Sequence, residues 1–334
     1  MDFPGLSLAL LDAIEEPALV VERERVAAAN APARALLGER IVGRDIRFVL
    51  RHPEALEVIL PGVGGEREIS SLGGRDQPWT ILVRPLPDGV QLVRLVDRSA
   101  AHSAERMRVD FVANASHELR TPLTTMIGYA ETLAEEGPIE EGLRAHFGET
   151  IHGEARRMLR IVEDLMSLSR IEADRFVAPH ERLALDELAR IAAENSGLLA
   201  RRTGCTIKLE LAPAGPIAGD FGQLLQLTDN LVGNALRYGC GGRNPLVTIR
   251  TSMDAGRAVL RVIDEGDGIP PDHLTRVTER FYRVDAARSR DSGGTGLGLS
   301  IVKHIAERHR AILEIRSVVG QGTEVVVAFP LLPR

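Results

Sequence analysis

Residues 112–133 read VANASHELRTPLTTMIGYAETL, and this stretch carries an apolar repeat of seven residues. One set of apolar side chains recurs at every seventh position: Val112, Leu119, Met126 and Leu133. A second set holds the other position of the same seam: Ala115, Pro122 and Tyr129. Gly128 is the single glycine between Ser99 and Glu136. The pattern predicts a long helix over about residues 99–136 that packs its seam against another helix.

A second helix is predicted to return along the first. The polar link at 136–141 contains Gly137 and Pro138 and is expected to turn the chain. The apolar residues that follow, up to about Ala173, are spaced by four, three, four and three positions: Ile151, Ala155, Met158, Val162 and Leu165. Two long helices joined by a short turn form an antiparallel hairpin. Because neither helix covers its own apolar stripe, we expect two hairpins to pair as a four-helix dimer.

His117 lies on the side of the first helix opposite the seam. Three polar residues share its stripe: Asp110, Thr124 and Glu131. A solvent-facing imidazole can act as a nucleophile, and the adjacent Glu118 can hydrogen-bond one ring nitrogen and raise the nucleophilicity of the other. Thr121 lies one turn further on the same face and is placed to hold a water. Taken alone, an ordinary exposed histidine on a helical bundle has the same pattern.

The sequences on either side of this hairpin predict two further domains. Residues 1–97 are expected to form a small α/β sensor domain with an antiparallel sheet, with strands at 18–21, 79–83 and 90–96 and a turn at 87–89. Residues 177–334 alternate helices and strands, beginning with one helix at 185–199, and predict an α/β sandwich with a mostly antiparallel sheet. The expected domains are therefore 1–97, 98–176 and 177–334.

Polar residues on the predicted helix at 221–237 form one candidate site. Asn230, Asn234 and Arg237 are spaced by four and three positions, so they share one helix face, and Tyr238 follows directly. Two amide oxygens on one face suit a Mg²⁺ ion that keeps waters and bridges phosphates. An ordinary polar helix face would give the same spacing.

Two glycine-containing motifs follow further along the chain. Asp264, at the end of a predicted strand, precedes Gly266 and Gly268; its carboxylate can accept a hydrogen bond from an exocyclic amine, and the glycines allow close backbone approach. A simple Asp/Gly turn remains the alternative. The second motif opens a helix, where glycine-rich backbone binds phosphate: Gly294, Thr295, Gly296, Leu297 and Gly298. The segment before it contains Arg283, Arg288 and Arg290, and we expect it to cover a triphosphate.

Composition excludes several classes of protein. The formal net charge of −6 does not favour nucleic-acid binding, which usually requires a basic excess. Cys205 and Cys240 are too few for a disulfide framework and lack metal-ligand spacing, so we expect a reducing cytoplasm. No run of about 18 apolar residues occurs, so no membrane span is expected in this chain. The chain is interpreted as soluble, or as the cytoplasmic part of a membrane-anchored sensor.

In this order and spacing, these motifs resemble the histidine kinase family, with its phosphoacceptor hairpin followed by the ATP-binding domain of gyrase-type ATPases. The resemblance extends from about Arg106 to the C-terminus and includes Phe281-Tyr282-Arg283. It implies that His117 accepts a phosphoryl group from ATP, that Glu118 serves as a base, and that Thr121 assists dephosphorylation of the partner. The implied partner is the receiver domain of a response regulator, phosphorylated on an aspartate.

The resemblance also assigns the nucleotide site. It implies that Asn230 and Asn234 carry Mg²⁺, that Asp264 reads adenine, and that residues 294–298 hold the phosphates. Arg237 departs from the family, which often has lysine at this position, but it keeps the positive charge. The stretch at 28–44 resembles a PAS sensor domain of phosphate-responsive kinases. His52 of this chain, which follows that stretch, is interpreted as a surface histidine. Two alternative functions are possible. A gyrase- or chaperone-type ATPase clamp needs no exposed histidine, and a non-catalytic dimeric scaffold needs no nucleotide motifs.

Overall fold

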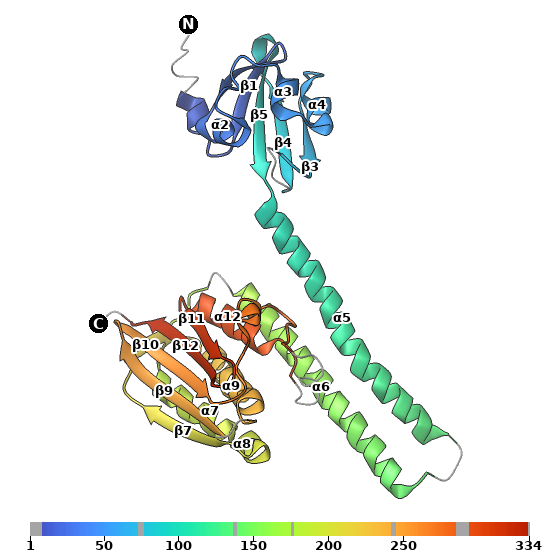
Figure 1. The fold of residues 1–334 in the computed structure, drawn as a ribbon, viewed down its shortest axis with the longest axis vertical. Coiled ribbons are helices and arrows are strands. Elements are labelled where there is room, and N and C mark those ends of the chain that lie inside the picture. Colours follow the sequence, from blue (N-terminus) through green and yellow to red (C-terminus); the bar gives the residue numbers. More distant parts are fainter. Residues whose placement is uncertain are drawn as a thin grey trace. The chain divides into compact units, whose positions relative to one another are not determined.

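The computed structural model describes residues 9–72, 77–135, 139–174, 177–241, 245–284 and 294–332. The chain forms two compact units, Met1–Val112 and Ala113–Arg334 (Figure 1). The predicted sandwich and most of the predicted hairpin fall within the second unit, and the boundary between the units lies inside the first long helix, Ser99–Ala134. The division into three domains at 97/98 and 176/177 therefore stays a prediction.

The first unit is built on a five-stranded sheet in the order β2-β1-β5-β4-β3, with every neighbouring pair antiparallel. Its strands are β1 (Ala18–Glu22), β2 (Arg25–Ala29), β3 (Gly65–Ile69), β4 (Trp79–Pro85) and β5 (Val90–Asp97). Its helical elements are α2 (Ala31–Leu37), α3 (Ile46–Leu50), α4 (Pro53–Ile59) and the short turn η1 (Pro87–Gly89). The three strands and the turn that the sequence predicts are present, whereas β2, β3, α3 and α4 were not predicted.

Buried Asn30 joins three segments of this unit. Its Oδ1 accepts hydrogen bonds from the amide of Ala33, which caps α2, and from the amide of Ala18 in β1. Its Nδ2 donates to the carbonyls of Ile14 and Glu16. An asparagine is well suited to this place because one amide group can cap a helix and also satisfy carbonyls of the preceding segment.

The second unit begins with an antiparallel helical hairpin, as predicted. Helices α5 (Ser99–Ala134) and α6 (Glu141–Ala173) lie side by side (Figure 1). Tyr129 packs on Phe147 with ring centroids 4.9 Å apart, and eleven residues earlier on α5 Glu118 binds Arg157, further along α6. The contacting residues have falling numbers along α5 and rising numbers along α6, so the two helices are antiparallel. Residues 136–138 of the predicted turn lie outside the described residues.

The C-terminal sandwich contains a five-stranded sheet in the order β11-β12-β10-β9-β7. Its strands are β7 (Thr206–Leu211), β9 (Leu246–Asp254), β10 (Arg257–Asp264), β11 (Ile312–Val318) and β12 (Gly322–Pro330), and only the β7–β9 pair is parallel. A smaller sheet pairs β6 (Glu181–Ala184) with β8 (Pro216–Gly219). The helices are α7 (Leu185–Asn195), α8 (Gly197–Thr203), α9 (Phe221–Tyr238), α10 (Pro271–Leu274) and α12 (Gly298–Arg308). The mostly antiparallel sandwich is confirmed, but the helix predicted at 185–199 is divided at Ser196.

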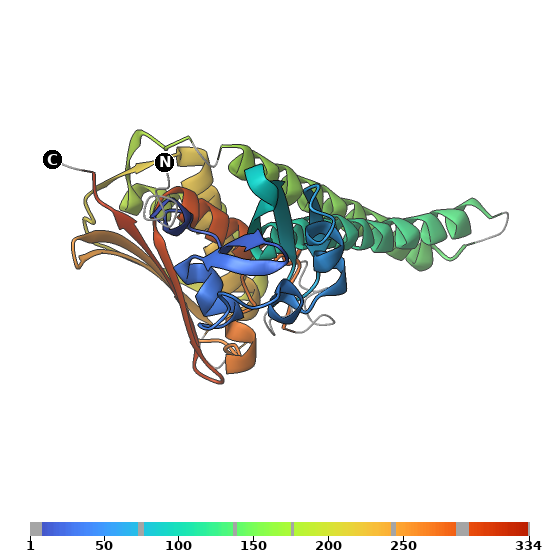
Figure 2. The ribbon, with the colours of Figure 1, turned by 90° about the horizontal axis from the view of Figure 1, so that it is seen from above.

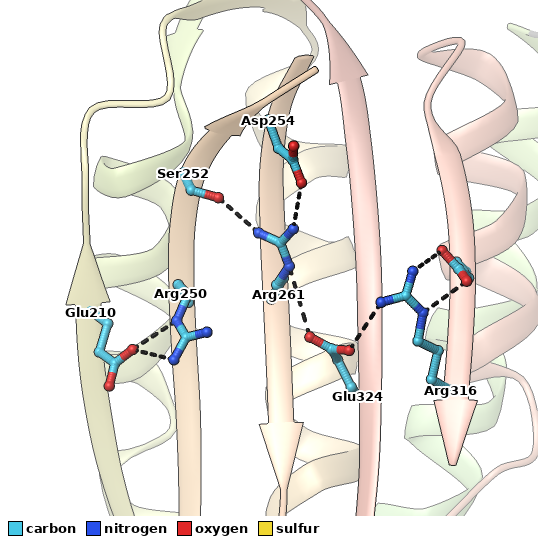
Figure 3. A network of polar contacts seen from close by, with 8 residues as sticks. Glu210, Arg250, Ser252, Asp254, Arg261, Arg316 and Glu324 are labelled. Atoms are coloured by element: carbon cyan, nitrogen blue, oxygen red, sulfur yellow. Dashed lines mark hydrogen bonds and ion pairs between the residues drawn. The ribbon is translucent and has the colours of Figure 1, made fainter. Parts of the chain in front are cut away.

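The large sheet is apolar on one face and charged on the other. Helices α7, α9 and α12 cover the apolar face, where alternate β10 residues Ala258, Leu260 and Val262 are buried (Figures 1 and 2). On the opposite face, Arg250 of β9 binds Glu210 of β7, and Glu324 of β12 binds the arginines of its two neighbouring strands (Figure 3). These exposed cross-strand pairs balance the charges, and each is expected to contribute less than about 1 kcal/mol.

The two cysteines, Cys205 and Cys240, form a disulfide, which the sequence did not predict. Their Cα atoms lie 5.7 Å apart. Cys205 directly precedes β7, after α8, and Cys240 follows α9, and α8 packs against α9. The sequence separation of 35 residues therefore gave no hint of their proximity, which the packing of two helices creates.

Among the residues that the structure describes, no helix combines the length and the apolar character needed to span a bilayer.

Candidate active site

Helix α9 carries the asparagine motif on the face opposite its core. Asp220 caps the helix by accepting a hydrogen bond from the amide of Gln223 at 3.1 Å. Leu224, Leu227 and Leu231 are buried. Asn230 and Asn234 are half-buried. The predicted shared face is therefore present as a polar stripe on a helix anchored by its apolar side.

The glycine loop meets this stripe at the start of α12. A Cβ placed on Gly298 would lie 3.7 Å from side-chain atoms of both Asn230 and Asn234, so the start of α12 faces the two amides at close range. The Nδ2 atom of Asn230 is buried and has no hydrogen-bond partner in the described part of the chain. A buried amide without a protein partner is a group available to a ligand. Two motifs separated by some 60 residues of sequence are thus brought together.

The loop is also joined to the Phe281-Tyr282-Arg283 motif. The amide of Phe281 donates to the carbonyl of Gly296 at 2.8 Å, and Arg283 Nη2 donates to the carbonyl of Gly294. Gly296 has φ +74°, and a Cβ there would lie 2.9 Å from the backbone of Phe281, so only glycine fits. Arg288 and Arg290 of the predicted covering segment lie outside the described residues.

Asp264 ends β10 beside the C-terminus of α9. Its Oδ1 accepts hydrogen bonds from the amides of Gly266 at 3.0 Å and Thr323 at 3.3 Å, whereas its Oδ2 has no partner among the described residues. Burial raises the pKa of this carboxyl, and the two amide bonds oppose the rise. A Cβ on Gly266 would lie 2.6 Å from the carbonyl of Tyr238, so the Asp264 turn packs directly on the end of α9. Gly268 follows in this turn, against Val318.

The phosphoacceptor motif lies on α5 in the same unit. His117 is exposed, as its position opposite the seam predicts. Glu118 Oε2 accepts a hydrogen bond from Arg157 at 2.8 Å and lies 3.5 Å from Arg283 Nη2. The Thr121 hydroxyl donates to the carbonyl of His117 at 3.2 Å. In this arrangement Glu118 is bound by two guanidinium groups, and the expected bond to the imidazole is replaced by these pairs.

A buried contact links helix α6 to the glycine loop. Thr295 donates its hydroxyl to Asp164 at 2.7 Å. Burial raises the pKa of Asp164, while the Thr295 bond and Arg237 oppose the rise. Burial also lowers the pKa of Arg237; Arg160 adds to that shift, and Tyr238 and Asp164 oppose it. Arg157 and Asp164 were not among the predicted site residues, and only their seven-residue spacing, which places both on one side of α6, could have suggested them.

The donor set fits Mg²⁺ bound together with phosphate rather than a preformed metal site. No group of three His, Cys, Asp or Glu side chains suitable for a metal occurs within the described residues. The amide oxygens of two neighbouring asparagines instead suit an ion that keeps most of its waters, and the unpartnered Nδ2 of Asn230 can donate to a phosphate oxygen.

Two family models match the chain. Residues 107–174 match the His Kinase A (phospho-acceptor) domain, and residues 219–333 match the histidine kinase-, DNA gyrase B- and HSP90-like ATPase. Together they cover the hairpin and most of the sandwich, and they leave the first unit unmatched up to residue 106.

Curated proteins and a solved structure give the same result. The phosphate regulon sensor protein PhoR of Pseudomonas aeruginosa is 42% identical over 320 residues, which cover 90% of this chain and 68% of that protein. A sensor protein kinase WalK of Staphylococcus aureus is 35% identical over 71% of this chain and 57% of its own length. The Acinetobacter baumannii histidine kinase AdeS is 20% identical, with a TM-score of 0.50 over 65% of this chain and 98% of that structure, and so shares the fold. The chain therefore belongs to the sensor histidine kinases of two-component signalling, enzymes that phosphorylate themselves with ATP and pass the phosphoryl group to a response regulator.

Proposed function

We propose that His117 is the phosphorylated residue and that ATP binds where α9, the Asp264 turn and the glycine loop meet. The observation that carries this proposal is the close approach of Gly298 to both Asn230 and Asn234, beside an amide nitrogen without a hydrogen-bond partner among the described residues. Three motifs that are far apart in sequence meet around one helix, and the phosphoacceptor histidine belongs to the same compact unit.

The free Oδ2 of Asp264 is proposed to accept a hydrogen bond from the amine of adenine, while Oδ1 holds the turn in place. Asn230 and Asn234 would hold Mg²⁺, which neutralises charge on the phosphates when bound. Arg237 and Arg283 supply positive charge, and the amides of the glycine loop cradle the phosphates at the start of α12. The exposed Tyr238 borders the base.

In the first step, a ring nitrogen of His117 attacks the γ-phosphorus of ATP, the bond to the β-phosphate oxygen breaks, and ADP leaves. Glu118 is proposed to take the imidazole proton, which requires it to exchange its guanidinium partners Arg157 and Arg283 for the ring. In the second step, an aspartate of a receiver domain takes the phosphoryl group from His117. We propose that Thr121 positions a water that hydrolyses the phosphoaspartate of the partner, which releases inorganic phosphate and restores the free aspartate.

The hairpin is proposed to form a homodimer. Large apolar side chains stay exposed in the single chain on both helices: Leu123, Ile127, Leu159, Val162 and Met166. Their spacings of three and four positions give one stripe on each helix, which a second hairpin would bury.

The first unit is proposed to be a PAS-like sensor domain. Its support is the antiparallel sheet in the order β2-β1-β5-β4-β3 with helices between β2 and β3. Because the reaction consumes ATP, we place the catalytic unit in the cytoplasm.

The proposal is tested by transfer from the labelled kinase to purified receiver domains. After labelling with radioactive ATP and removal of nucleotide, the label should move to the acceptor aspartate of a cognate receiver, and an Asp→Asn receiver should stay unlabelled. Retention of the label on the kinase with every receiver of the source organism would contradict the proposal.

A further inference from the structure

The first unit contains a cavity of about 480 Å³ that no catalytic residue touches. Its floor is formed by Ile41, Leu50 and Leu72, each 4% exposed or less, which belong to the hydrophobic core of this unit. The hollow is half open to solvent, and residues of the hydrophobic core form part of its lining. Its volume is in the range of small-molecule sites.

The rim of this cavity is positively charged. Arg44 and Arg51 line it, together with the half-buried His52 and Ser71, and none of its lining residues in the described chain is acidic. Some arginines elsewhere in the unit form ion pairs, such as Arg47 with Glu24 and Arg94 with Glu16. The guanidinium of Arg44 has no hydrogen bond or ion pair within the described residues. The rim thus presents charge that the protein leaves unbalanced.

Two further features point to a ligand at this rim. The Nδ1 atom of His52 is buried and has no hydrogen-bond partner in the described part of the chain, so the expectation of a surface histidine is wrong for this atom. Arg51 ends α3 with φ +43° and ψ +25°, a left-handed conformation that favours glycine and costs an arginine about 1 kcal/mol. Its Nε donates to the carbonyl of Phe48 at 3.0 Å, which leaves both terminal nitrogens free.

We propose that this cavity binds a small amphipathic anion, with its carboxylate or phosphate group on Arg44, Arg51 and His52 and its apolar body on the core. Two free guanidinium groups recognise such a headgroup by charge-assisted hydrogen bonds. The apolar floor excludes a purely inorganic anion as the best ligand, because it would leave that floor uncovered. The ligand class follows from the combination of an unbalanced cationic rim and a floor of core leucine and isoleucine.

The test uses 8-anilinonaphthalene-1-sulfonate, an apolar fluorophore with one sulfonate, on the full chain with excess Mg-ADP to fill the nucleotide site. We expect one saturable site whose affinity falls at least about tenfold in Arg44→Gln and in Arg51→Gly. Arg67→Gln, which changes an arginine paired with Glu57 outside the cavity, is the control and should bind as wild type. The uncharged analogue N-phenyl-1-naphthylamine should not lose affinity in these variants.

Arg51→Gly separates a ligand role from a structural one. Glycine suits the left-handed conformation, so this variant should melt at the same temperature as wild type or higher while it binds the probe more weakly. Octanoate or octyl phosphate should displace the probe, and which of them binds more tightly identifies the headgroup. Equal probe affinity in wild type and both variants, or equal displacement by octanol, would overturn the proposal.

Discussion

Replacement of Asp264 by asparagine isolates the adenine contact from the fold of the site. Asparagine keeps Oδ1, which accepts from the amides of Gly266 and Thr323, and converts the unpartnered Oδ2 into an NH₂ donor. The turn should therefore persist, while the group proposed to accept from the adenine amine is lost. A hydrogen bond to a charged group contributes about 1.5–3 kcal/mol. At 1.36 kcal/mol per tenfold change, ATP affinity should weaken by about 10- to 150-fold.

The assay is calorimetric titration of Mg-ATP, with a thermal melt of each variant. Asp254→Asn makes the same chemical change at an exposed carboxylate at the far end of β9 and should leave ATP affinity unchanged. Because burial raises the pKa of Asp264, ATP affinity should also begin to fall at a higher pH than an ordinary aspartate would require. Wild-type ATP affinity in a folded Asp264→Asn variant would refute the assignment of this carboxylate.

Four other substitutions test three separate parts of the account. Asn234→Ala should lower autophosphorylation at least about 100-fold, because the amide is proposed to hold Mg²⁺. The melting temperature should change little, because the amide makes no other bond among the described residues. Near-normal rates at millimolar Mg²⁺ would exclude the metal role. Thr121→Ala should keep most autophosphorylation and lose most phosphatase activity. Glu118→Ala should instead lower autophosphorylation by about 100-fold or more. A proportional loss of both activities in Thr121→Ala would indicate a structural role. Burial lowers the pKa of His309, whose Nε2 accepts a hydrogen bond from the Asp220 amide, so the unfolded chain binds the proton more readily than the folded chain. The melting temperature should therefore decrease as the pH is lowered through about 6.5. His309→Gln should make the melting temperature less dependent on pH in this range.

Local patterns in the sequence predicted the elements that build the site. The seven-residue repeat predicted the hairpin, and four- and three-residue spacing predicted the shared face of Asn230 and Asn234, because both depend on helical periodicity alone. The exposure of His117 followed from the same periodicity. Strand β3 (Gly65–Ile69) was missed because its residues are mostly polar and exposed, so no apolar alternation marks it.

Contacts between distant segments could not be predicted in this way. The pairing of Glu118 with Arg157 and Arg283 joins residues 39 and 165 positions apart, and it depends on how the hairpin and the sandwich pack. The disulfide between Cys205 and Cys240 depends on the packing of α8 against α9. The cationic cavity likewise combines α3 with residues that follow β3, and an arginine in a left-handed conformation has no signature in the sequence.

The central claim is that His117 carries the phosphoryl group. Its most direct test is labelling of the purified chain with radioactive Mg-ATP, followed by acid and base treatment and by the same experiment on His117→Gln. The account predicts one phosphate per chain on a nitrogen of His117, labile in acid and stable in base, and absent from His117→Gln, which should still bind ATP. Equal labelling of wild type and His117→Gln would contradict it.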